Sequence, residues 1–325
     1  MNKFILLSCT LISVLTTFSC QTVPLIDLKG DTIINIENRM VIALWPEGTE
    51  GINPTIAEKT HSGKNMFYNI HNPSLTLFKP KTPNGTSVII IPGGGYGAVG
   101  FNLEGVPTAE RLVKEGITVF ILKYRLPTTK GVNFKHPVPL MDAQRAIKLV
   151  RYHADTFDIR SDQIGIIGFS AGGHLASTAG TLFNSPIQAS DDIGKINCRP
   201  DFMMLIYPVI TTQAKESCHP CTNSLVGKDS APGLLKKLSN ELNVTHDTPP
   251  TFLAHAKDDK GVPPKNSRLF HEALKKHGIR TTLKIYEKGG HYKGFFKKES
   301  DNDALNWMDD CVTWMHTMEL LSENR

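Results

Sequence analysis

The stretch that decides the fold is Gly168-Phe169-Ser170-Ala171-Gly172-Gly173. The apolar run 163–167 before it is typical of a buried parallel strand, and residues 174–179 after it predict the start of a helix. In a strand–turn–helix of the G-x-S-x-G type, small residues at Gly168 and Gly172 allow a tight turn that exposes the Ser170 hydroxyl. The pattern therefore predicts that Ser170 is a nucleophile; a glycine-rich packing turn is the alternative interpretation.

Two segments are expected to offer free backbone N–H groups near this serine. Ala171 follows it at the start of a helix, where N–H groups lack partners and the helix dipole is positive. Pro92-Gly93-Gly94-Gly95-Tyr96 follows the apolar strand 87–91 and carries no bulky side chain over its amides. We predict an oxyanion hole made by Ala171, Gly94 and Gly95. A phosphate-binding loop is the alternative, but the Gly-Lys-Ser/Thr of a P-loop is missing.

A serine nucleophile needs a base, and the base needs a carboxylate that orients it. In a fold with this turn, the chain order is serine, then Asp or Glu, then His. The loop from His255 to Pro263 follows a predicted strand and contains two adjacent aspartates. We choose Asp259 as the orienting carboxylate, with Asp258 as the second candidate.

The predicted base is His291. It follows the strand 282–286, so it should lie at the same edge of the sheet as Ser170, and Gly289-Gly290 lets the backbone bend toward the serine. The chain contains 12 histidines, so other candidates exist. We expect His174 to be a packing or hydrogen-bonding residue, and His271 and His277 to be solvated on a lysine-bearing helix.

Strands alternate with helices along the chain, which predicts an α/β fold with a mostly parallel sheet covered on both faces. We expect one catalytic domain over residues 65–325, preceded by an irregular leader over 21–64. A strand pair is expected within 66–78 around a turn at 72–74. Further strands are expected at 118–122, 202–207 and 251–255, helices at 107–115, 140–153, 267–277 and 303–321, and an insertion at 211–242.

Residues 1–20 have the features of a targeting segment. Lys3 is followed by a mostly apolar run over 4–18 that is too short for a comfortable membrane span. Cys20 stands at the expected cleavage point. We therefore expect an exported bacterial protein, either periplasmic or held at the outer membrane by a lipid on Cys20; plain secretion is the alternative to lipidation.

Composition excludes some classes of function. Hydrophobic residues make up 40% and charged residues 21% of the 325 residues, as in ordinary globular proteins. The positively charged residues that give the net charge of +5 are scattered along the chain, so we expect no nucleic-acid partner.

Cys218 and Cys221 have C-x-x-C spacing without a second ligand pair, which favours a local disulfide or unpaired thiols over a zinc or redox centre. The pairing of Cys198 and Cys311 stays open.

From about Val41 to the C-terminus, the chain resembles α/β-hydrolase esterases, and most closely the acetylxylan-esterase and feruloyl-esterase-like group, called BD-FAE-like. The resemblance implies an α/β-hydrolase fold and a serine esterase that acts on acylated carbohydrate such as xylan. In this group an aspartate stands three positions before a Val-Pro pair, which favours Asp259 before Val262. The motifs are 45–48 (WPEG), 92–96 (PGGGY), 123–127 (KYRLP), 142–146 (DAQRA), 168–174 (GFSAGGH), 255–259 (HAKDD) and 287–291 (EKGGH).

Two positions depart from related patterns. Pro92 stands where the lipase motif His-Gly-Gly-Gly has histidine, which argues against a hormone-sensitive-lipase assignment. Tyr292 follows His291 where small residues are common in this group, so the substrate side of the pocket is expected to differ. We expect no metal or organic cofactor, because serine chemistry needs none and the H-E-x-x-H zinc motif is absent.

Two alternative functions fit part of the sequence. A prolyl-oligopeptidase-like serine peptidase has a similar turn and aspartate loop, but there is no room for its propeller before residue 87. A surface lipoprotein that binds glycans without cleaving them would not need a serine, an aspartate and a histidine in catalytic order. The sequence therefore predicts a carbohydrate esterase.

Overall fold

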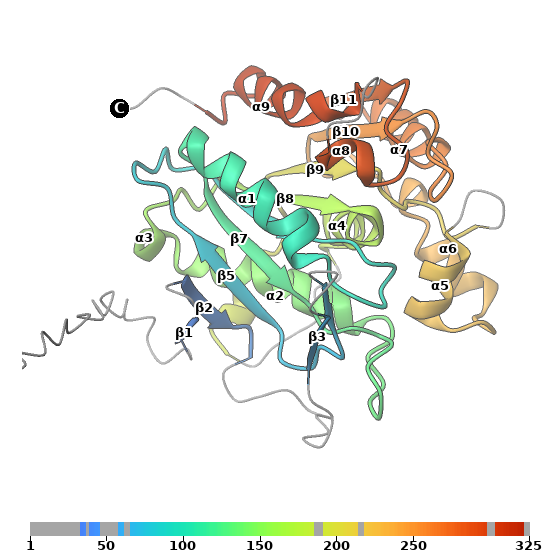
Figure 1. The fold of residues 1–325 in the computed structure, drawn as a ribbon, viewed down its shortest axis with the longest axis horizontal. Helices are drawn as coiled ribbons and strands as arrows, with labels where there is room; N and C mark the ends of the chain where they lie inside the picture. The colour runs from blue at the N-terminus through green and yellow to red at the C-terminus, as the bar shows by residue number, and fades with distance from the viewer. Residues whose placement is uncertain are drawn as a thin grey trace, which may run out of the picture.

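The structure is a computed structural model that describes residues 33–36, 39–45, 58–61, 66–184, 191–213, 218–297 and 303–321. Within these ranges the chain forms a nine-stranded sheet in the order β1-β2-β5-β7-β6-β8-β9-β10-β11 (Figure 1). Neighbouring strands from β7 to β11 in this order are parallel, and β1, β2 and β5 add antiparallel pairings at one side. The prediction of a mostly parallel sheet is confirmed. The strands are β1 (Ile33–Ile36), β2 (Arg39–Ala43), β5 (Ser74–Phe78), β6 (Ser87–Ile91), β7 (Thr118–Lys123), β8 (Ile164–Phe169), β9 (Phe202–Ile206), β10 (Thr251–Ala256) and β11 (Thr281–Tyr286).

Helices cover both faces of this sheet (Figure 1). Successive residues of a strand point to opposite faces. Accordingly Ile89 and Ile91 pack in a core with α2, α4 and α7, whereas Val88 and Ile90 pack in a second core with α1 and α9. The helices are α1 (Val106–Leu112), α2 (Val138–Tyr152), α3 (Ala154–Phe157), α4 (Ser170–Thr181), α5 (His219–Val226), α6 (Pro232–Lys237), α7 (Lys265–Lys276), α8 (Lys293–Phe296) and α9 (Trp307–Thr317), with the short turns η1 (Phe101–Gly105), η2 (Val113–Glu115), η3 (Ile193–Lys195), η4 (Asn240–Leu242) and η5 (Ala304–Asn306).

Part of the leader 21–64, which we expected to be irregular, is strand. β1 and β2 extend the central sheet through β5, and β3 (Lys59–His61) pairs with β4 (Met66–Tyr68). The prediction is wrong for these residues: β1 and β2 carry β-branched and apolar side chains that favour a strand, whereas the polar β3 is a strand through its pairing with β4. The predicted targeting segment 1–20, with Cys20, lies outside the described residues. In the part of the chain that is described, no helix has the length and hydrophobicity to cross a membrane.

The two strands expected within 66–78 both exist, but they do not pair with each other. β4 pairs with β3, whereas β5 lies between β2 and β7 in the main sheet. All five residues of β5 are buried, as in a strand covered on both faces, while those of β4 are half-buried. The predicted pairing is therefore wrong, because burial in the main sheet decides the partner of β5.

A buried ion pair links the end of β7 to α2. The Arg125 guanidinium lies 2.7 Å from Oδ1 of Asp142, and the Arg125 backbone N–H donates to Oδ2 at 2.8 Å. The Trp45 indole N–H also donates to Asp142, at 2.9 Å. These residues belong to three of the motifs that carry the family resemblance, and they act in the scaffold rather than at the predicted site.

Candidate active site

The turn between β8 and α4 presents Ser170. Its φ is 52°, in the left-handed region that costs most residues energy. A Cβ at Gly168 would lie 2.5 Å from the carbonyl oxygen of Gly172, and one at Gly172 would lie 2.1 Å from that of Ile91. Both distances are far below van der Waals contact, so this turn requires glycine on each side of the serine.

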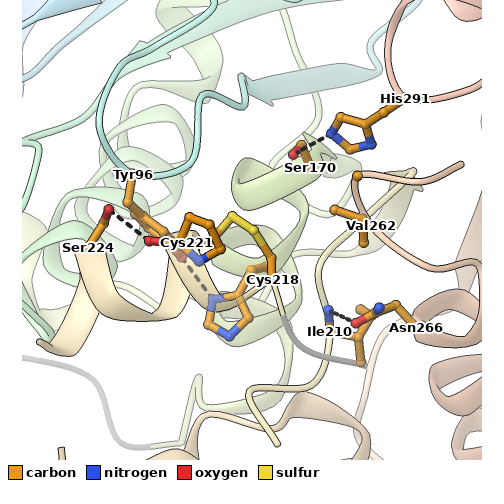
Figure 2. Close-up of a disulfide and its surroundings, with 12 residues drawn as sticks. Tyr96, Ser170, Ile210, Cys218, Cys221, Ser224, Val262, Asn266 and His291 are labelled. Carbon is orange, nitrogen blue, oxygen red and sulfur yellow. Dashed lines mark hydrogen bonds between the residues drawn. A yellow bond between two sulfur atoms is a disulfide. The ribbon is translucent and has the colours of Figure 1, made fainter. Parts of the chain in front are cut away.

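Ser170, His291 and Asp259 form one hydrogen-bonded array. Ser170 Oγ lies 2.9 Å from His291 Nε2, an interaction drawn as a dashed line in Figure 2. His291 Nδ1 lies 2.7 Å from Asp259 Oδ2. Because an ionised carboxylate only accepts, Nδ1 carries the proton and Nε2 is free to accept the serine proton. The structure therefore brings together the three residues predicted from chain order, in the tautomer that a base requires.

Asp259 is held as an anion by its surroundings. Its Oδ1 accepts the N–H groups of Gly261 at 2.8 Å and Val262 at 2.9 Å, and its Oδ2 faces both His291 and His255. Burial alone would raise the pKa of Asp259, but the hydrogen bonds from His255, His291 and Val262 outweigh it and hold the pKa well below its usual value. The side chain therefore stays ionised over the working pH range of an esterase.

His255 fixes Asp259 from the far side. Its Nε2 lies 3.2 Å from Asp259 Oδ2 and 2.9 Å from the Val262 carbonyl oxygen, and its Nδ1 lies 2.8 Å from Ser267 Oγ. Since the carbonyl can only accept, Nε2 carries the proton and Nδ1 accepts from the serine hydroxyl. Sequence reasoning assigned no role to His255; its only sequence signal is a polar residue within a buried strand.

Asp258, the second candidate, has a different task. Its Oδ1 accepts the N–H groups of Gly289 at 3.0 Å and Gly290 at 2.8 Å. These glycines immediately precede His291, so Asp258 holds the loop that carries the predicted base. The two adjacent aspartates thus hold the same histidine, Asp259 through its ring and Asp258 through its backbone.

The glycine loop after β6 lies beside Ser170. Gly94 and Gly95 have φ of 129° and 63°, conformations that suit glycine. Both line the pocket that contains Ser170. Among the described residues, the N–H groups of Gly94, Gly95 and Ala171 donate to no recorded partner. These are the three donors predicted for the oxyanion hole.

Tyr96 anchors this loop to α4. Its hydroxyl lies 2.8 Å from His174 Nδ1, and His174 Nε2 lies 2.8 Å from the Leu238 carbonyl oxygen. Burial lowers the pKa of His174 to about 4, so this ring stays neutral. The expectation that His174 is a hydrogen-bonding residue is confirmed. Of the two histidines expected to be solvated, His277 is exposed, whereas His271 is half-buried beside Thr281.

A pocket of about 380 Å³ opens above Ser170. A disulfide between Cys218 and Cys221 lines this pocket; Figure 2 draws it together with Ser170 and His291. Of the two states that the sequence left open for these cysteines, the structure shows the bonded one, while Cys198 and Cys311 are free and buried. In the described ranges, no group of three His, Cys, Asp or Glu side chains could hold a metal ion. The pocket lining is Met66, Gly93, Gly94, Gly95, Gly100, Leu103, Glu104, Ser170, Cys218, Cys221, Gly261, Val262, His291 and Tyr292.

Comparison with known families gives the assignment. The BD-FAE family model matches residues 75–274, a segment that includes Ser170, Asp259 and the glycine loop. This chain belongs to the BD-FAE family. The family and the α/β-hydrolase fold expected from the sequence motifs are therefore confirmed.

Several relatives of this BD-FAE chain are known. An acetylxylan esterase from Xylanibacter ruminicola is 31% identical over 254 residues, 77% of this chain and 49% of that protein. Endo-1,4-beta-xylanase B from Butyrivibrio fibrisolvens is 30% identical over 227 residues, 70% of this chain and 34% of that protein. The chain thus spans about half or less of these two relatives. The crystal structure of an acetyl ester-xyloside bifunctional hydrolase from Caldicellulosiruptor lactoaceticus is 34% identical, with a TM-score of 0.74 over 87% of this chain and 97% of that one.

Proposed function

We propose that this protein is a serine carboxylic-ester hydrolase that removes acetyl groups from xylan or xylo-oligosaccharides. The observation that carries the proposal is the array Ser170–His291–Asp259, with contacts of 2.9 and 2.7 Å. It lies at the base of an open pocket beside backbone N–H groups that have no partner among the described residues. The acetylxylan esterase and the acetyl ester-xyloside hydrolase among its relatives support the choice of substrate.

The first half-reaction forms an acyl-enzyme. His291 Nε2 takes the proton of Ser170 as Oγ bonds to the ester carbonyl carbon, and the imidazolium is stabilised by the Asp259 carboxylate. The N–H groups of Gly94, Gly95 and Ala171 receive the oxyanion; one such donor contributes about 10²–10³ to kcat in other hydrolases. The carbon–oxygen bond to the sugar then breaks, and His291 returns the proton to the departing hydroxyl.

The second half-reaction releases acetate. Water gives a proton to His291 and bonds to the acyl carbon, and the bond to Ser170 Oγ breaks as the serine regains its proton. No step needs a metal or cofactor. A pocket of about 380 Å³ falls within the roughly 300–1,000 Å³ of small-ligand sites, which leaves room for a sugar unit beside the acyl group.

Acetate release from acetylated xylan tests the proposal, with an aryl acetate, methyl ferulate and a prolyl aryl amide assayed in parallel. We expect release from xylan by the wild type and none by Ser170→Ala, which should unfold at the same temperature. Hydrolysis of the aryl acetate alone would reject xylan but keep ester hydrolysis. Cleavage of the amide would favour the peptidase alternative, and full activity in Ser170→Ala would reject the mechanism.

Export is part of the same proposal. It is supported by the targeting features of residues 1–20 and by the Cys218–Cys221 disulfide, which suits an oxidising compartment. Mass spectrometry of the mature N-terminus tests it. A diacylglyceryl group on Cys20 would mean a lipoprotein, an unmodified end after cleavage would mean plain secretion, and an intact N-terminus would reject export.

A further inference from the structure

The pocket contains a second buried carboxyl group that the mechanism does not use. Glu104 lies on η1, is 6% exposed and lines the same pocket as Ser170. Buried acidic side chains are rare unless they are paired. Neither of its two recorded hydrogen-bond partners carries a positive charge, so a salt bridge through these contacts does not account for its burial.

One partner belongs to the oxyanion loop. The Gly93 N–H donates a short hydrogen bond, 2.5 Å, to Glu104 Oε2. Gly93 directly precedes Gly94, one of the predicted oxyanion donors. A Cβ at Gly93 would lie 2.9 Å from that of Ser170, so this part of the loop packs tightly against the nucleophile. Glu104 thereby fixes where the loop turns toward the serine and where the next two amides point.

The other partner lies against the base. The Tyr207 hydroxyl donates to Glu104 Oε1 at 2.9 Å, and the centroids of the Tyr207 and His291 rings are 4.9 Å apart in an edge-on contact. Tyr207 itself has φ of 38°, a strained value for a non-glycine residue. One carboxyl group therefore joins the loop on one side of Ser170 to the ring that supports His291 on the other.

The pKa of Glu104 reflects its burial and its hydrogen bonds. Burial raises its pKa to about 7, while the hydrogen bonds from Gly93 and Tyr207 and the charge of His291 lower it in part. The other ionisable groups that interact with it are the phenols of Tyr124, Tyr207 and Tyr292, whose own pKa values are raised by burial and by Glu104, so they remain neutral. His291 is the neighbour whose positive charge favours the ionised form.

We propose that Glu104 is a positioning residue for ester hydrolysis, which in its ionised form holds the oxyanion loop through Gly93 and the His291 ring through Tyr207. The inference rests on the serine-hydrolase part of the proposed function and not on the identity of the sugar. Ionised Glu104 also stabilises the protonated His291 that forms as the serine attacks.

The hydrogen-bond roles show which variant separates geometry from charge. The Gly93 N–H can only donate, so the oxygen facing it must accept; the Tyr207 hydroxyl can rotate and accept instead. Glu104→Gln can therefore keep both contacts, with its amide oxygen at Gly93 and its NH₂ at Tyr207, without a negative charge. Glu104→Leu removes both contacts, and Tyr207→Phe removes one of the donors that lower the Glu104 pKa.

The test follows two reactions of Ser170 across pH 5 to 9: hydrolysis of an aryl acetate and inactivation by a fluorophosphonate. We expect the wild-type acid limb in kcat/KM to reflect two ionisations. Glu104→Gln should show a limb with one ionisation and a lower plateau, because the charge that stabilises protonated His291 during the reaction is gone. Tyr207→Phe should displace the limb to higher pH. Glu104→Leu should lose kcat by about 10², the order of one lost oxyanion donor, with KM changed less than threefold. Glu110→Gln, on the exposed side of α1, is the matched control.

The same profile in Glu104→Gln and the wild type, or an unmoved limb in Tyr207→Phe, would overturn the inference even if Glu104→Leu did not fold. So would Glu104→Leu with kcat within threefold of the wild type. A wild type that reacts with both probes but does not deacetylate xylan would reject the proposed substrate and leave this inference standing. A wild type inert to both probes would reject serine hydrolysis and this inference together.

Discussion

Asp259→Asn is expected to disable the base without disturbing the fold. The two backbone N–H groups of Gly261 and Val262 donate to Oδ1 at 2.8 and 2.9 Å, so in the variant this position must hold the amide oxygen. The NH₂ group then stands at the place of Oδ2, 2.7 Å from His291 Nδ1. An NH₂ group only donates, so Nδ1 must accept and the ring proton moves to Nε2.

This tautomer cannot take the proton of Ser170. The corresponding loss in a serine protease is about 10⁴ in kcat, which is about 5.4 kcal/mol of transition-state stabilisation at 1.36 kcal/mol per tenfold change. We expect a loss of 10³ to 10⁴ here, since His255 can also rearrange around the new amide. The assay is steady-state hydrolysis of an aryl acetate, with fluorophosphonate labelling as a check that Ser170 is accessible.

Asp258→Asn is the matched control. Its amide oxygen can still accept the N–H groups of Gly289 and Gly290, so kcat should stay within about tenfold of the wild type, at the same melting temperature. If Asp259→Asn kept kcat within tenfold, or Asp258→Asn lost as much as Asp259→Asn, the assignment of the two aspartates would be refuted.

Three further predictions concern the scaffold. Asp142→Ala should lower the free energy of unfolding by about 3–5 kcal/mol, measured in urea, because it leaves the buried Arg125 without its counter-ion; a loss below 1 kcal/mol would contradict this. Replacing both Cys218 and Cys221 by serine should raise KM more than it lowers kcat, since the disulfide lines the pocket but does not touch the hydrogen-bonded array; the reverse pattern would count against it. The pKa of His174 is 6.5 when unfolded and about 4 when folded, so the wild type should lose up to about 3 kcal/mol of stability as pH falls from 6.5 to 4. A His174→Asn variant should lack this part of the slope, and equal slopes would refute the assignment.

The proximity of Ser170, Asp259 and His291 is the part of the site that the sequence could predict, for a steric reason at the serine and a topological one at the other two. Ser170 is recognisable because its turn tolerates nothing larger than glycine at 168 and 172, so the constraint is written in local sequence. Asp259 and His291 follow from topology: each comes after a parallel strand, and the carboxyl ends of parallel strands meet at one edge of the sheet. The strands β9, β10 and β11 bring these segments beside the turn between β8 and α4 in that way.

The supporting residues were beyond sequence reasoning because tertiary packing creates their roles. Glu104 stands in a segment without a recognisable motif, Phe101–Gly105, and its proposed role depends on a tertiary contact, the hydrogen bond from the Gly93 N–H. His255 is one polar residue in a buried strand, and its contact with Asp259 depends on how the next loop folds back. Likewise, the strands β1 and β2 were missed because short apolar runs between turn residues pair with the sheet only when an edge such as β5 is available.

The two buried carboxyl groups near Ser170 differ for a physical reason that can be followed in their hydrogen bonds. Asp259 receives donors on both oxygens, including two imidazoles, and its pKa stays far below neutrality. Among the residues that the structure describes, Glu104 receives hydrogen bonds from Gly93 and Tyr207 alone, and its pKa rises to about 7. Carboxyl groups whose environments separate their pKa values commonly have separate tasks. Asp259 stays ionised and orients His291 at every working pH. Glu104, in contrast, ionises more readily when His291 becomes positive, because that charge lowers the Glu104 pKa. Because Glu104 takes up a proton near neutral pH and Asp259 does not, this active site should lose activity at a higher pH on acidification, and more steeply, than a site that depends on Asp259 alone.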